Sequence, residues 1–282
     1  MTRFLVTGAG GQLGQEFVAL LEGSRHEVIA ASKDDLDVSD RDQVFAAIKG
    51  LSPDVVIHSA AWTAVDMCES DPQRAFATNS FGTRNIAEAS RQSHAHVVYI
   101  SSDYVFDGAA GRPYVEWDLP NPISVYGRSK LGGELEMSPS DTIVRTSWVC
   151  GRHGANFVST MLRLAASDAQ VPVVDDQFGS PTFTADLAQM IWRLALDRRG
   201  GIWHVTNQGE TSWFGFARAV FEAAGADPDR VRPIPTSELS PARPAPRPIR
   251  STLANTALQA AGERLAPAWE ESLAKLVAEL AG

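Results

Sequence analysis

The chain has 282 residues, of which 44% are hydrophobic and 21% charged, and its formal net charge is -9. This composition is that of a globular protein with a substantial core, and it excludes a mostly disordered chain. The acidic balance argues against nucleic-acid or anionic-membrane partners. Only two cysteines are present, Cys68 and Cys150, so a disulfide framework and a cysteine metal cluster are excluded. Because no apolar run has the length of a signal peptide or a membrane span, we expect a cytoplasmic protein.

The first segment predicts a nucleotide-binding turn. Residues 4–6 form an uninterrupted apolar run, typical of a strand buried on both faces, and apolar residues recur at helical spacing over 17–21. Between them, residues 8–14 carry glycines in the pattern G-x-x-G-x-x-G. Such a turn lets a pyrophosphate approach the backbone at the N-terminus of the following helix. Because Leu13 stands where the stricter G-x-G-x-x-G pattern has its third glycine, an ordinary strand–helix turn is an equally good interpretation.

Residues 26–31 predict the second strand, and the side chains after it bear on the choice of cofactor. Sites for NAD commonly place an acidic residue on the ribose there, whereas Lys33 stands here and could meet a 2'-phosphate. We therefore expect NADPH or NADH, with NADPH slightly favoured. Asp37 either caps the helix expected at 40–49 or contacts the adenine.

Two further buried strands are expected at residues 53–58 and 94–100. The first of them ends in small residues, which would let a flat ligand approach the backbone at the carboxyl edge of the sheet. The second ends near Ser102, at the same edge. His94 and His96 lie at the opposite end of that strand, so we interpret them as solvated or structural rather than as metal ligands.

Tyr126 and Lys130 follow a loop rich in turn-forming residues at 108–122. On a helix, side chains four residues apart point to one face. Such a pair occurs by chance in many helices, as a solvated lysine beside a half-buried tyrosine. Its position downstream of Ser102 and of a nucleotide turn instead favours a proton-delivery site beside a hydride carrier.

The alternation of strands and helices predicts an α/β fold with a doubly wound parallel sheet of Rossmann type. We expect residues 1–150 to form an NAD(P)-binding domain, with 185–207 packing back onto it. We expect residues 151–282 to form mainly a smaller mixed α/β substrate domain. A proline-rich run at 233–248 contains arginines and is either a linker or a phosphate-holding loop. The remaining expected elements are strands at 142–149, 171–174 and 201–205 and helices at 75–89, 157–166, 186–196, 213–224 and 269–280.

Together, the nucleotide turn, the serine and the Tyr-x-x-x-Lys pair resemble the extended short-chain dehydrogenase/reductase superfamily over essentially the whole chain. Further stretches resemble one family within it, the dTDP-4-dehydrorhamnose reductases, and they are residues 60–66, 102–108, 145–149, 176–182 and Arg247-Pro248 ahead of Ser251. The resemblance implies NAD(P)H-dependent reduction of the C4 ketone of dTDP-4-dehydro-L-rhamnose to dTDP-L-rhamnose, the last step of dTDP-rhamnose synthesis. The alternatives are a reductase of a different dTDP-4-keto-deoxysugar and a non-catalytic regulatory relative that binds NADP.

The resemblance also implies roles for individual residues. The catalytic residues would be Ser102, Tyr126 and Lys130. The residues at the cofactor would be Gly8, Gly11, Gln12, Leu13, Asp37, Val38, Ala60, Ala61, Thr63, Tyr126 and Lys130. The residues at the sugar nucleotide would be Ser102, Asp103, Tyr104, Trp148 and Arg247. In this scheme Tyr126 delivers the proton, Ser102 hydrogen-bonds the sugar carbonyl, and Lys130 holds the nicotinamide ribose.

Elementary electrostatics suggests how Tyr126 would be tuned. A free tyrosine has a pKa of about 10, and lowering it by ~3 units needs ~4 kcal/mol. One ammonium about 4 Å away in an effective dielectric of ~20 supplies roughly that much. We therefore expect Lys130 to lower the pKa of Tyr126 without help from a metal. A donor such as Ser102, aimed at the developing oxyanion, is often worth ~3 kcal/mol.

Some members of the resembled family bind magnesium, and this sequence has only some of the carboxylates used for it. Family members that dimerise through magnesium use carboxylates, and Glu16 and Glu279 stand at two of those positions. Ala185 stands at the position between them, with Asp186 next to it. Magnesium is therefore doubtful, and we expect no metal and a monomer or weak homodimer. Cys150 stands where tyrosine is common and is interpreted as a small apolar substitute.

Overall fold

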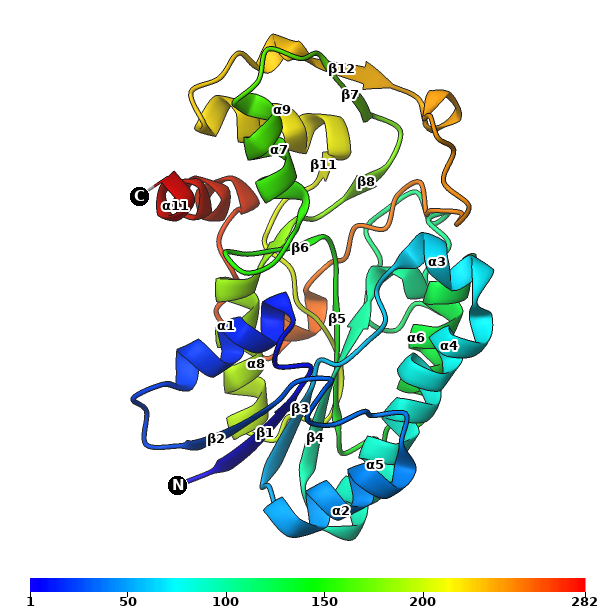
Figure 1. Cartoon of the computed structure of the whole chain (residues 1–282), viewed down its shortest axis with the longest axis vertical. Coiled ribbons are helices and arrows are strands. Elements are labelled where there is room, and N and C mark those ends of the chain that lie inside the picture. Colours follow the sequence, from blue (N-terminus) through cyan, green and yellow to red (C-terminus); the bar gives the residue numbers. More distant parts are fainter. Residues whose placement is uncertain (282) are drawn as a thin grey trace.

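The computed structural model describes residues 1–281, and its centre is a six-stranded sheet with the order β10-β5-β4-β3-β1-β2 (Figure 1). Every pairing in this sheet is parallel. Its strands are β1 (Arg3–Thr7), β2 (Glu27–Ala31), β3 (Val55–His58), β4 (His96–Ser102), β5 (Thr142–Thr146) and β10 (Gly201–His204). The doubly wound parallel sheet expected from the sequence is confirmed. The chain continues on opposite sides of β1, first to β2 and later to β3, and ligands bind at such a reversal point, beyond the carboxyl ends of the strands.

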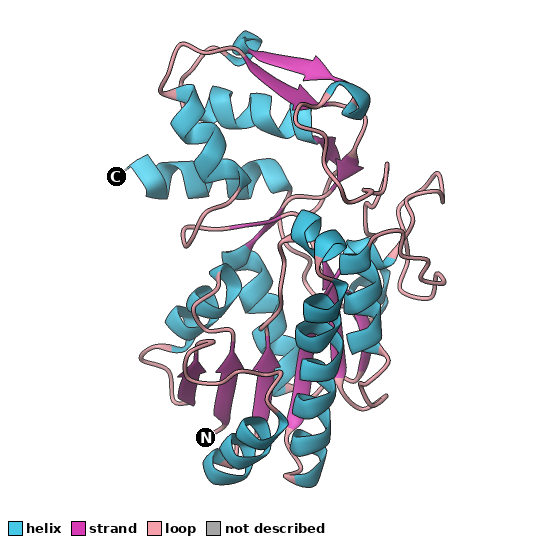
Figure 2. Ribbon diagram, turned by 45° about the vertical axis from the view of Figure 1, so that its right-hand side comes forward, coloured by secondary structure: helices cyan, strands magenta, loops and turns pink. Residues whose placement is uncertain are grey.

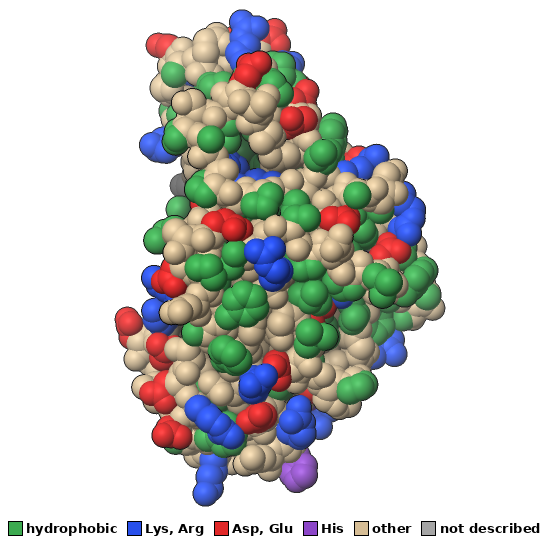
Figure 3. Space-filling model, turned by 90° about the vertical axis from the view of Figure 1, so that its right-hand side faces the viewer, with side chains coloured by type: hydrophobic (Ala, Val, Ile, Leu, Met, Phe, Trp, Pro, Cys, Tyr) green, Lys and Arg blue, Asp and Glu red, His purple; other side chains and the backbone are tan. Residues whose placement is uncertain are grey.

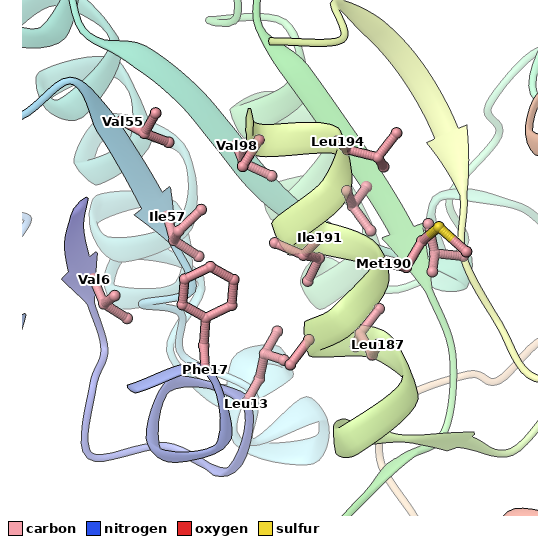
Figure 4. Packing of buried hydrophobic residues seen from close by; sticks show 14 of the residues in the cluster. Val6, Leu13, Phe17, Val55, Ile57, Val98, Leu187, Met190, Ile191 and Leu194 are labelled. Carbon is pink, nitrogen blue, oxygen red and sulfur yellow. The ribbon is translucent and has the colours of Figure 1, made fainter. Parts of the chain in front are cut away.

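Helices cover both faces of the sheet (Figures 1 and 2). One face carries α1 (Gln12–Leu21) and α8 (Thr184–Leu196), and the other face carries α2 (Arg41–Leu51) and α5 (Gly82–Gln92). Figure 4 shows Phe17 of α1 and Ile191 of α8 directed toward strand residues such as Ile57. Each of these side chains is fully buried. Burying an aliphatic or aromatic side chain of this size contributes about 1.5–3 kcal/mol, so this packing fixes the frame that holds the carboxyl edge of the sheet.

The helix expected at 75–89 is interrupted by a π-helical turn. The segment runs as α4 (Pro72–Phe76), η1 (Ala77–Phe81) and then α5. Asn79, inside the π turn, accepts a hydrogen bond from the Trp62 amide (2.7 Å) and donates to the Ser129 hydroxyl (2.9 Å). Single π turns are frequent at functional sites. Here the turn aims one amide side chain at both the loop after β3 and the helix that carries Tyr126.

A second lobe lies beyond the carboxyl ends of the six strands (Figures 1 and 2). Its core joins Val158, Phe216, Phe221 and Leu273 from three helices. Its helices are α7 (Phe157–Ala165), α9 (Trp213–Ala223) and α11 (Trp269–Ala281). Its strands pair in twos, as β6 (Val149–Cys150) with β9 (Thr182–Phe183), β7 (Val171–Val174) with β12 (Val231–Ile234), and β8 (Phe178–Gly179) with β11 (Thr211–Ser212).

Several short elements connect these parts. They are α3 (Val65–Ser70), α6 (Val125–Glu134), α10 (Thr256–Ala260), η2 (Asp103–Val105), η3 (Pro228–Arg230) and η4 (Thr236–Glu238). Although α8 and β10 come late in the chain, α8 packs on the large sheet and β10 pairs with β5 at its edge. The division into domains at residue 150 stays a prediction.

On the face of the molecule shown in Figure 3, acidic and basic side chains are interspersed among uncharged ones. This face therefore has no large patch of purely positive or purely negative charge. Among the described residues, no helix combines the length and the apolar character needed to cross a bilayer. Cys150 is buried in the core of the second lobe, and burial raises the pKa of its thiol to about 12. A thiol in that state stays protonated at neutral pH, which agrees with the interpretation of Cys150 as a small apolar residue.

Candidate active site

The glycine turn joins β1 to α1 at the carboxyl edge of the sheet. Gly8 has a φ of +68°, and a Cβ on it would lie 2.7 Å from the Ala60 backbone after β3. Only glycine fits such a position, so the ends of β1 and β3 can approach each other closely. Gly11 is the N-cap of α1, and no side chain in residues 1–281 caps that helix. Its first amides are therefore available to an anion, which a helix N-terminus attracts.

A cavity of about 340 Å³ extends from this turn toward the end of β2, and we call it the Lys33 cavity. The predicted cofactor residues in its lining are Gly8, Asp37, Val38, Ala60 and Ala61. Asp37 accepts hydrogen bonds from the Ser39 amide (2.9 Å) and hydroxyl (2.6 Å), so it caps its own turn while lining the cavity. Arg74 also lines it, with its guanidinium 4.4 Å from the Trp62 ring centroid, a placement that no sequence motif predicted.

A second cavity of about 430 Å³ shares Gly8 and Ala61 with the first, and we call it the Tyr126 cavity. The two form one crevice along the carboxyl edge of the sheet. The other predicted site residues that line the Tyr126 cavity are Gly11, Gln12, Leu13, Thr63, Ser102, Asp103, Tyr104, Tyr126, Lys130 and Trp148. The structure thus brings together residues from the ends of β1, β3, β4 and β5 and from α6.

Two polar atoms in the wall of the Tyr126 cavity lack hydrogen-bond partners within the described part of the chain. They are Gln12 Oε1 and Thr146 Oγ1, both buried. More than nine in ten buried polar groups in proteins are hydrogen-bonded, so unpaired ones in a cavity wall fit a site for a polar ligand. Together with the open N-terminus of α1, they fit a nucleotide cofactor.

Helix α6 places the tyrosine and the lysine. It begins after Ser124, whose hydroxyl accepts a hydrogen bond from the Gly127 amide (3.1 Å) as an N-cap. A Cβ at Gly127 would clash with the Tyr104 carbonyl oxygen, so the missing side chain lets α6 pack against η2. Tyr126 and Lys130 then both face the crevice, as expected for a four-residue spacing.

Ser102 is held by hydrogen bonds on both sides. Its hydroxyl donates to Asp103 Oδ1 (3.0 Å) and accepts from the Tyr104 amide (3.2 Å). The other carboxylate oxygen of Asp103 accepts from the Ser251 hydroxyl (2.5 Å). Burial raises the pKa of Asp103 to about 6. Both oxygens of Asp103 are therefore engaged within the protein.

The predicted lowering of the Tyr126 pKa is wrong for the chain without ligands. Burial raises the pKa of Tyr126 well above 10, and a hydrogen bond with the Ser102 hydroxyl offsets only part of that rise. Burial also lowers the pKa of Lys130 to about 7, with the Glu134 carboxylate acting in the opposite direction. The simple Coulomb argument omitted desolvation, which penalises phenolate and ammonium alike. Tyr126 is consequently fully protonated at neutral pH, which is the form that a proton donor needs.

A pair of stacked tryptophans forms one wall of the Tyr126 cavity. The rings of Trp148 and Trp213 are 3.6 Å apart at 8°. Trp148 has a φ of +47°, which is rare for a bulky residue, and a Cβ on Gly179 would lie 2.6 Å from its ring. Strained residues of this kind cluster at functional sites. Trp213 was missed from the sequence, where it only marks the start of a helix.

Arg247 is the predicted site residue that the structure does not bring into the crevice lining formed by residues 1–281. Its guanidinium makes an ion pair with Asp66, with nitrogen–oxygen distances of 3.0 and 2.7 Å. Arg250 is paired in the same way with Glu210. Arg247 and Arg250 are thus both bound to carboxylates, and these ion pairs connect residues 247–250 to α3 and to the residue before β11.

Glu16, at an implied magnesium position, and Asp186, next to another, are both engaged by side chains of the protein. Glu16 lies 3.4 Å from Arg152 and accepts a hydrogen bond from the Thr184 hydroxyl (3.2 Å). Asp186 accepts from Asn207 (2.7 Å) and from Ser272 (2.6 Å). Within residues 1–281, no group of three His, Cys, Asp or Glu side chains is placed to hold a metal ion.

The chain is similar to known proteins both in sequence and in structure. The family described as RmlD substrate binding domain matches residues 2–281. A dTDP-4-dehydrorhamnose reductase from Streptomyces griseus is 44% identical over 290 residues, covering 99% of this chain and 94% of that protein. A dTDP-4-keto-6-deoxy-D-glucose reductase from Streptomyces niveus is 44% identical over 249 residues, covering 87% of this chain and 86% of that protein. The crystal structure of dTDP-4-dehydrorhamnose reductase from Bacillus anthracis in complex with NADP is 38% identical, with a TM-score of 0.93 and 99% of both chains covered.

Proposed function

Since the chain belongs to the dTDP-4-dehydrorhamnose reductase family, we propose that it reduces the C4 ketone of dTDP-4-dehydro-L-rhamnose to dTDP-L-rhamnose with NADPH or NADH. The observation that carries the proposal is the single crevice that holds the glycine turn at one end and Ser102, Tyr126 and Lys130 at the other. A binding module has no need of a buried proton donor next to a nucleotide turn. This argues for an enzyme rather than a regulatory relative.

The cofactor would lie along the crevice. The open N-terminus of α1, with Gly8 and Gly11, suits its pyrophosphate. Lys33 suits a 2'-phosphate, and Lys130 suits the ribose next to the nicotinamide. The other residues proposed at the cofactor are Gln12, Leu13, Asp37, Val38, Ala60, Ala61 and Thr63. When bound, the reduced nicotinamide supplies the hydride that the ketone accepts.

The protein's own residues then handle the proton. The ketone oxygen becomes an alkoxide as C4 gains its hydrogen, and that oxygen takes a proton from the Tyr126 hydroxyl. Ser102 is placed beside Tyr126 to hydrogen-bond the same oxygen. The resulting phenolate is stabilised by the Lys130 ammonium. The raised pKa of Tyr126 keeps its hydroxyl protonated until the hydride has been transferred. Because the alkoxide is strongly basic, proton transfer from Tyr126 to it is favourable.

The residues proposed around the sugar are Ser102, Asp103, Tyr104, Trp148 and Arg247. In the structure, the first four line the Tyr126 cavity, whereas Arg247 contacts Asp66 nearby. We add Trp213 to this set, because its ring is stacked on Trp148 in the same wall.

Lys33→Ala is expected to raise KM for NADPH about tenfold, the equivalent of ~1.4 kcal/mol, while leaving KM for NADH nearly unchanged. The reason is that only NADPH carries the 2'-phosphate that Lys33 would meet. Steady-state kinetics with both cofactors tests this, with Asp34→Ala as the neighbouring control. Equal changes in KM for NADPH and NADH would show that Lys33 does not contact the 2'-phosphate.

Trp213→Ala is expected to raise KM for the sugar nucleotide by roughly tenfold or more, because Trp148 loses the ring that holds it in its strained conformation. Trp117→Ala is the matched control, since Trp117 is 70% exposed. Kinetics should be combined with thermal unfolding to separate binding from stability. An unchanged KM in a folded Trp213→Ala variant would remove this wall from the substrate site.

A second candidate substrate has specific support from the Streptomyces niveus relative, which is named for a dTDP-4-keto-6-deoxy-D-glucose substrate. The two substrates differ in sugar stereochemistry, so the chemistry at Tyr126 would be the same. The deciding experiment offers each dTDP-ketosugar separately, generated in place by upstream enzymes, and follows NADPH oxidation. Preferential turnover of dTDP-4-dehydro-L-rhamnose supports the proposal, and preference for the other ketosugar replaces it.

We further propose a cytoplasmic enzyme that is a monomer or weak homodimer without bridging magnesium. The support is that Glu16 is already paired with Arg152. Light scattering with magnesium and then with a chelator should give one and the same mass. A dimer that dissociates in the chelator would contradict this.

A further inference from the structure

Helix α6 carries a third functional side chain on the face of Tyr126 and Lys130. Glu134 lies four residues after Lys130, so the three side chains repeat at helical spacing on one face. The Glu134 side chain is only 4% exposed. A carboxylate is rarely buried so deeply unless it is paired.

Strong hydrogen bonds from two adjacent strands hold this carboxylate. Arg145 donates from Nε to Oε1 (2.9 Å) and from Nη2 to Oε2 (2.7 Å), and Ser101 donates from Oγ to Oε1 (2.5 Å). Arg145 of β5 pairs in register with Ser101 of β4. The Arg145 side chain is 1% exposed. A bidentate guanidinium–carboxylate pair of this kind holds the carboxylate in a fixed orientation.

The surroundings of Lys130 supply no other carboxylate on its own helix. Its ammonium lies 4.2 Å from the ring centroid of Tyr99 on β4. The ring of His58 on β3 packs against Tyr99 at a tilt of 30°, with the two centroids 5.6 Å apart. Burial lowers the pKa of His58 to about 3, so His58 is neutral. Asp103 on η2 is engaged by Ser102 and Ser251. Charged groups on the other helices packed against α6 also contact other partners. They include Asp66 with Arg247, Glu69 with the Val125 amide, Arg74 with Trp62, Arg84 with Glu136, and Glu88 with Arg41.

We propose that Glu134 is a positioning residue of the active site, whose carboxylate, locked by Arg145 and Ser101, keeps the charge on Lys130 within the crevice. Glu134 acts through Lys130 and is not part of the crevice lining formed by residues 1–281. The ion pair is thus more than a structural link between α6 and the sheet. The role in turnover rests on the proposed reductase function, but the effect on Lys130 does not.

The titration of Lys130 can be followed directly, because the chain has only four lysines, which are Lys33, Lys49, Lys130 and Lys275. In the full-length protein labelled with ¹³Cε-lysine, the Lys130 signal is assigned by its loss in Lys130→Arg. Glu134→Gln is expected to lower the titration midpoint of Lys130 by about 1–3 pH units, the usual effect of one close opposite charge. An unchanged midpoint in the folded variant would overturn the proposal.

Glu136→Gln is the matched control. Glu136 is also paired with an arginine, Arg84, at 2.7 Å, but that pair is on the surface. Glu136→Gln should therefore leave the titration midpoint of Lys130 at its wild-type value. If Glu134→Gln fails to fold because Arg145 is left unpaired, the double variant Glu134→Gln/Arg145→Gln removes both charges together. The lowering expected there is smaller, because the positive charge of Arg145, which opposes the effect of Glu134 on Lys130, is lost as well. A Lys130 midpoint at or above that of the wild type in the folded double variant would overturn the proposal.

The pH dependence of turnover gives a second readout that a purely structural role would not move. If the Lys130 charge is needed, kcat/KM falls as the pH rises through the Lys130 midpoint. In Glu134→Gln this descending limb should shift to lower pH by the same amount as the NMR midpoint, and in Glu136→Gln it should not shift. If no dTDP-ketosugar is reduced at all, the proposed function fails, while the NMR titration still decides the role of Glu134.

Discussion

Tyr126→Phe is expected to lower kcat by roughly 10²–10⁴-fold, the usual contribution of a positioned proton donor. The phenyl ring can still fill the buried space beside Tyr104, whose ring lies 5.7 Å away, so the fold should survive. Only the hydroxyl that is proposed to deliver the proton is lost. Affinity for NADPH, measured by fluorescence titration, should therefore change little while turnover falls.

Tyr104→Phe is the matched control for this variant. Tyr104 lines the same cavity and is also a buried tyrosine, with its pKa raised to about 12 by burial. Its loss of a hydroxyl should cost much less turnover, because Tyr104 is assigned to the sugar rather than to the proton. Wild-type turnover in Tyr126→Phe would show that another group delivers the proton.

Lys130→Ala is expected to reduce kcat/KM by roughly 10²-fold or more and also to weaken NADPH binding. Loss of one preorganised charge from a desolvated site commonly costs that much in turnover. The second effect follows from the contact proposed between Lys130 and the nicotinamide ribose. Unlike the tyrosine variant, this variant should therefore change both turnover and cofactor affinity.

Lys275→Ala serves as the control, because Lys275 lies on α11 and lines neither cavity of the crevice as the described residues form them. It should leave both quantities unchanged. Differential scanning calorimetry on each variant separates lost function from lost fold. If Lys130→Ala alters neither turnover nor NADPH affinity, lysine has no part in the mechanism.

The parallel sheet was predictable because its strands are short apolar runs followed by turn-forming residues. The ends of the strands were less predictable where polar residues continue a strand beyond its apolar run. β4 continues to Ser102, past the expected end at residue 100, because Ser101 and Ser102 pair with Arg145 and Thr146 of β5. The strand expected at 142–149 stops at Thr146, since Trp148 adopts a left-handed φ that no sequence pattern indicated.

The part of the site that lies close to the strand ends was also predictable, because carboxyl ends of parallel strands meet at one edge. Trp213 and Arg74 were missed, since their approach to the crevice depends on the packing of α9 and α4 rather than on a local motif. The Tyr126 pKa was predicted in the wrong direction, because the depth of burial could not be read from the spacing of Tyr126 and Lys130. The spacing of four residues between Lys130 and Glu134 was visible in the sequence. The pairing of Glu134 with Arg145 was not predictable, because Arg145 lies on β5.

The most direct test of the central claim follows a hydrogen atom. The enzyme is supplied with NADPH deuterated at nicotinamide C4 on each face in turn, together with dTDP-4-dehydro-L-rhamnose generated in place. We expect dTDP-L-rhamnose with deuterium at C4 of the sugar for one of the two labelled cofactors, seen by NMR and mass spectrometry. NADPH oxidation without deuterium at C4 from either cofactor, or bound NADPH with no sugar product, would contradict it.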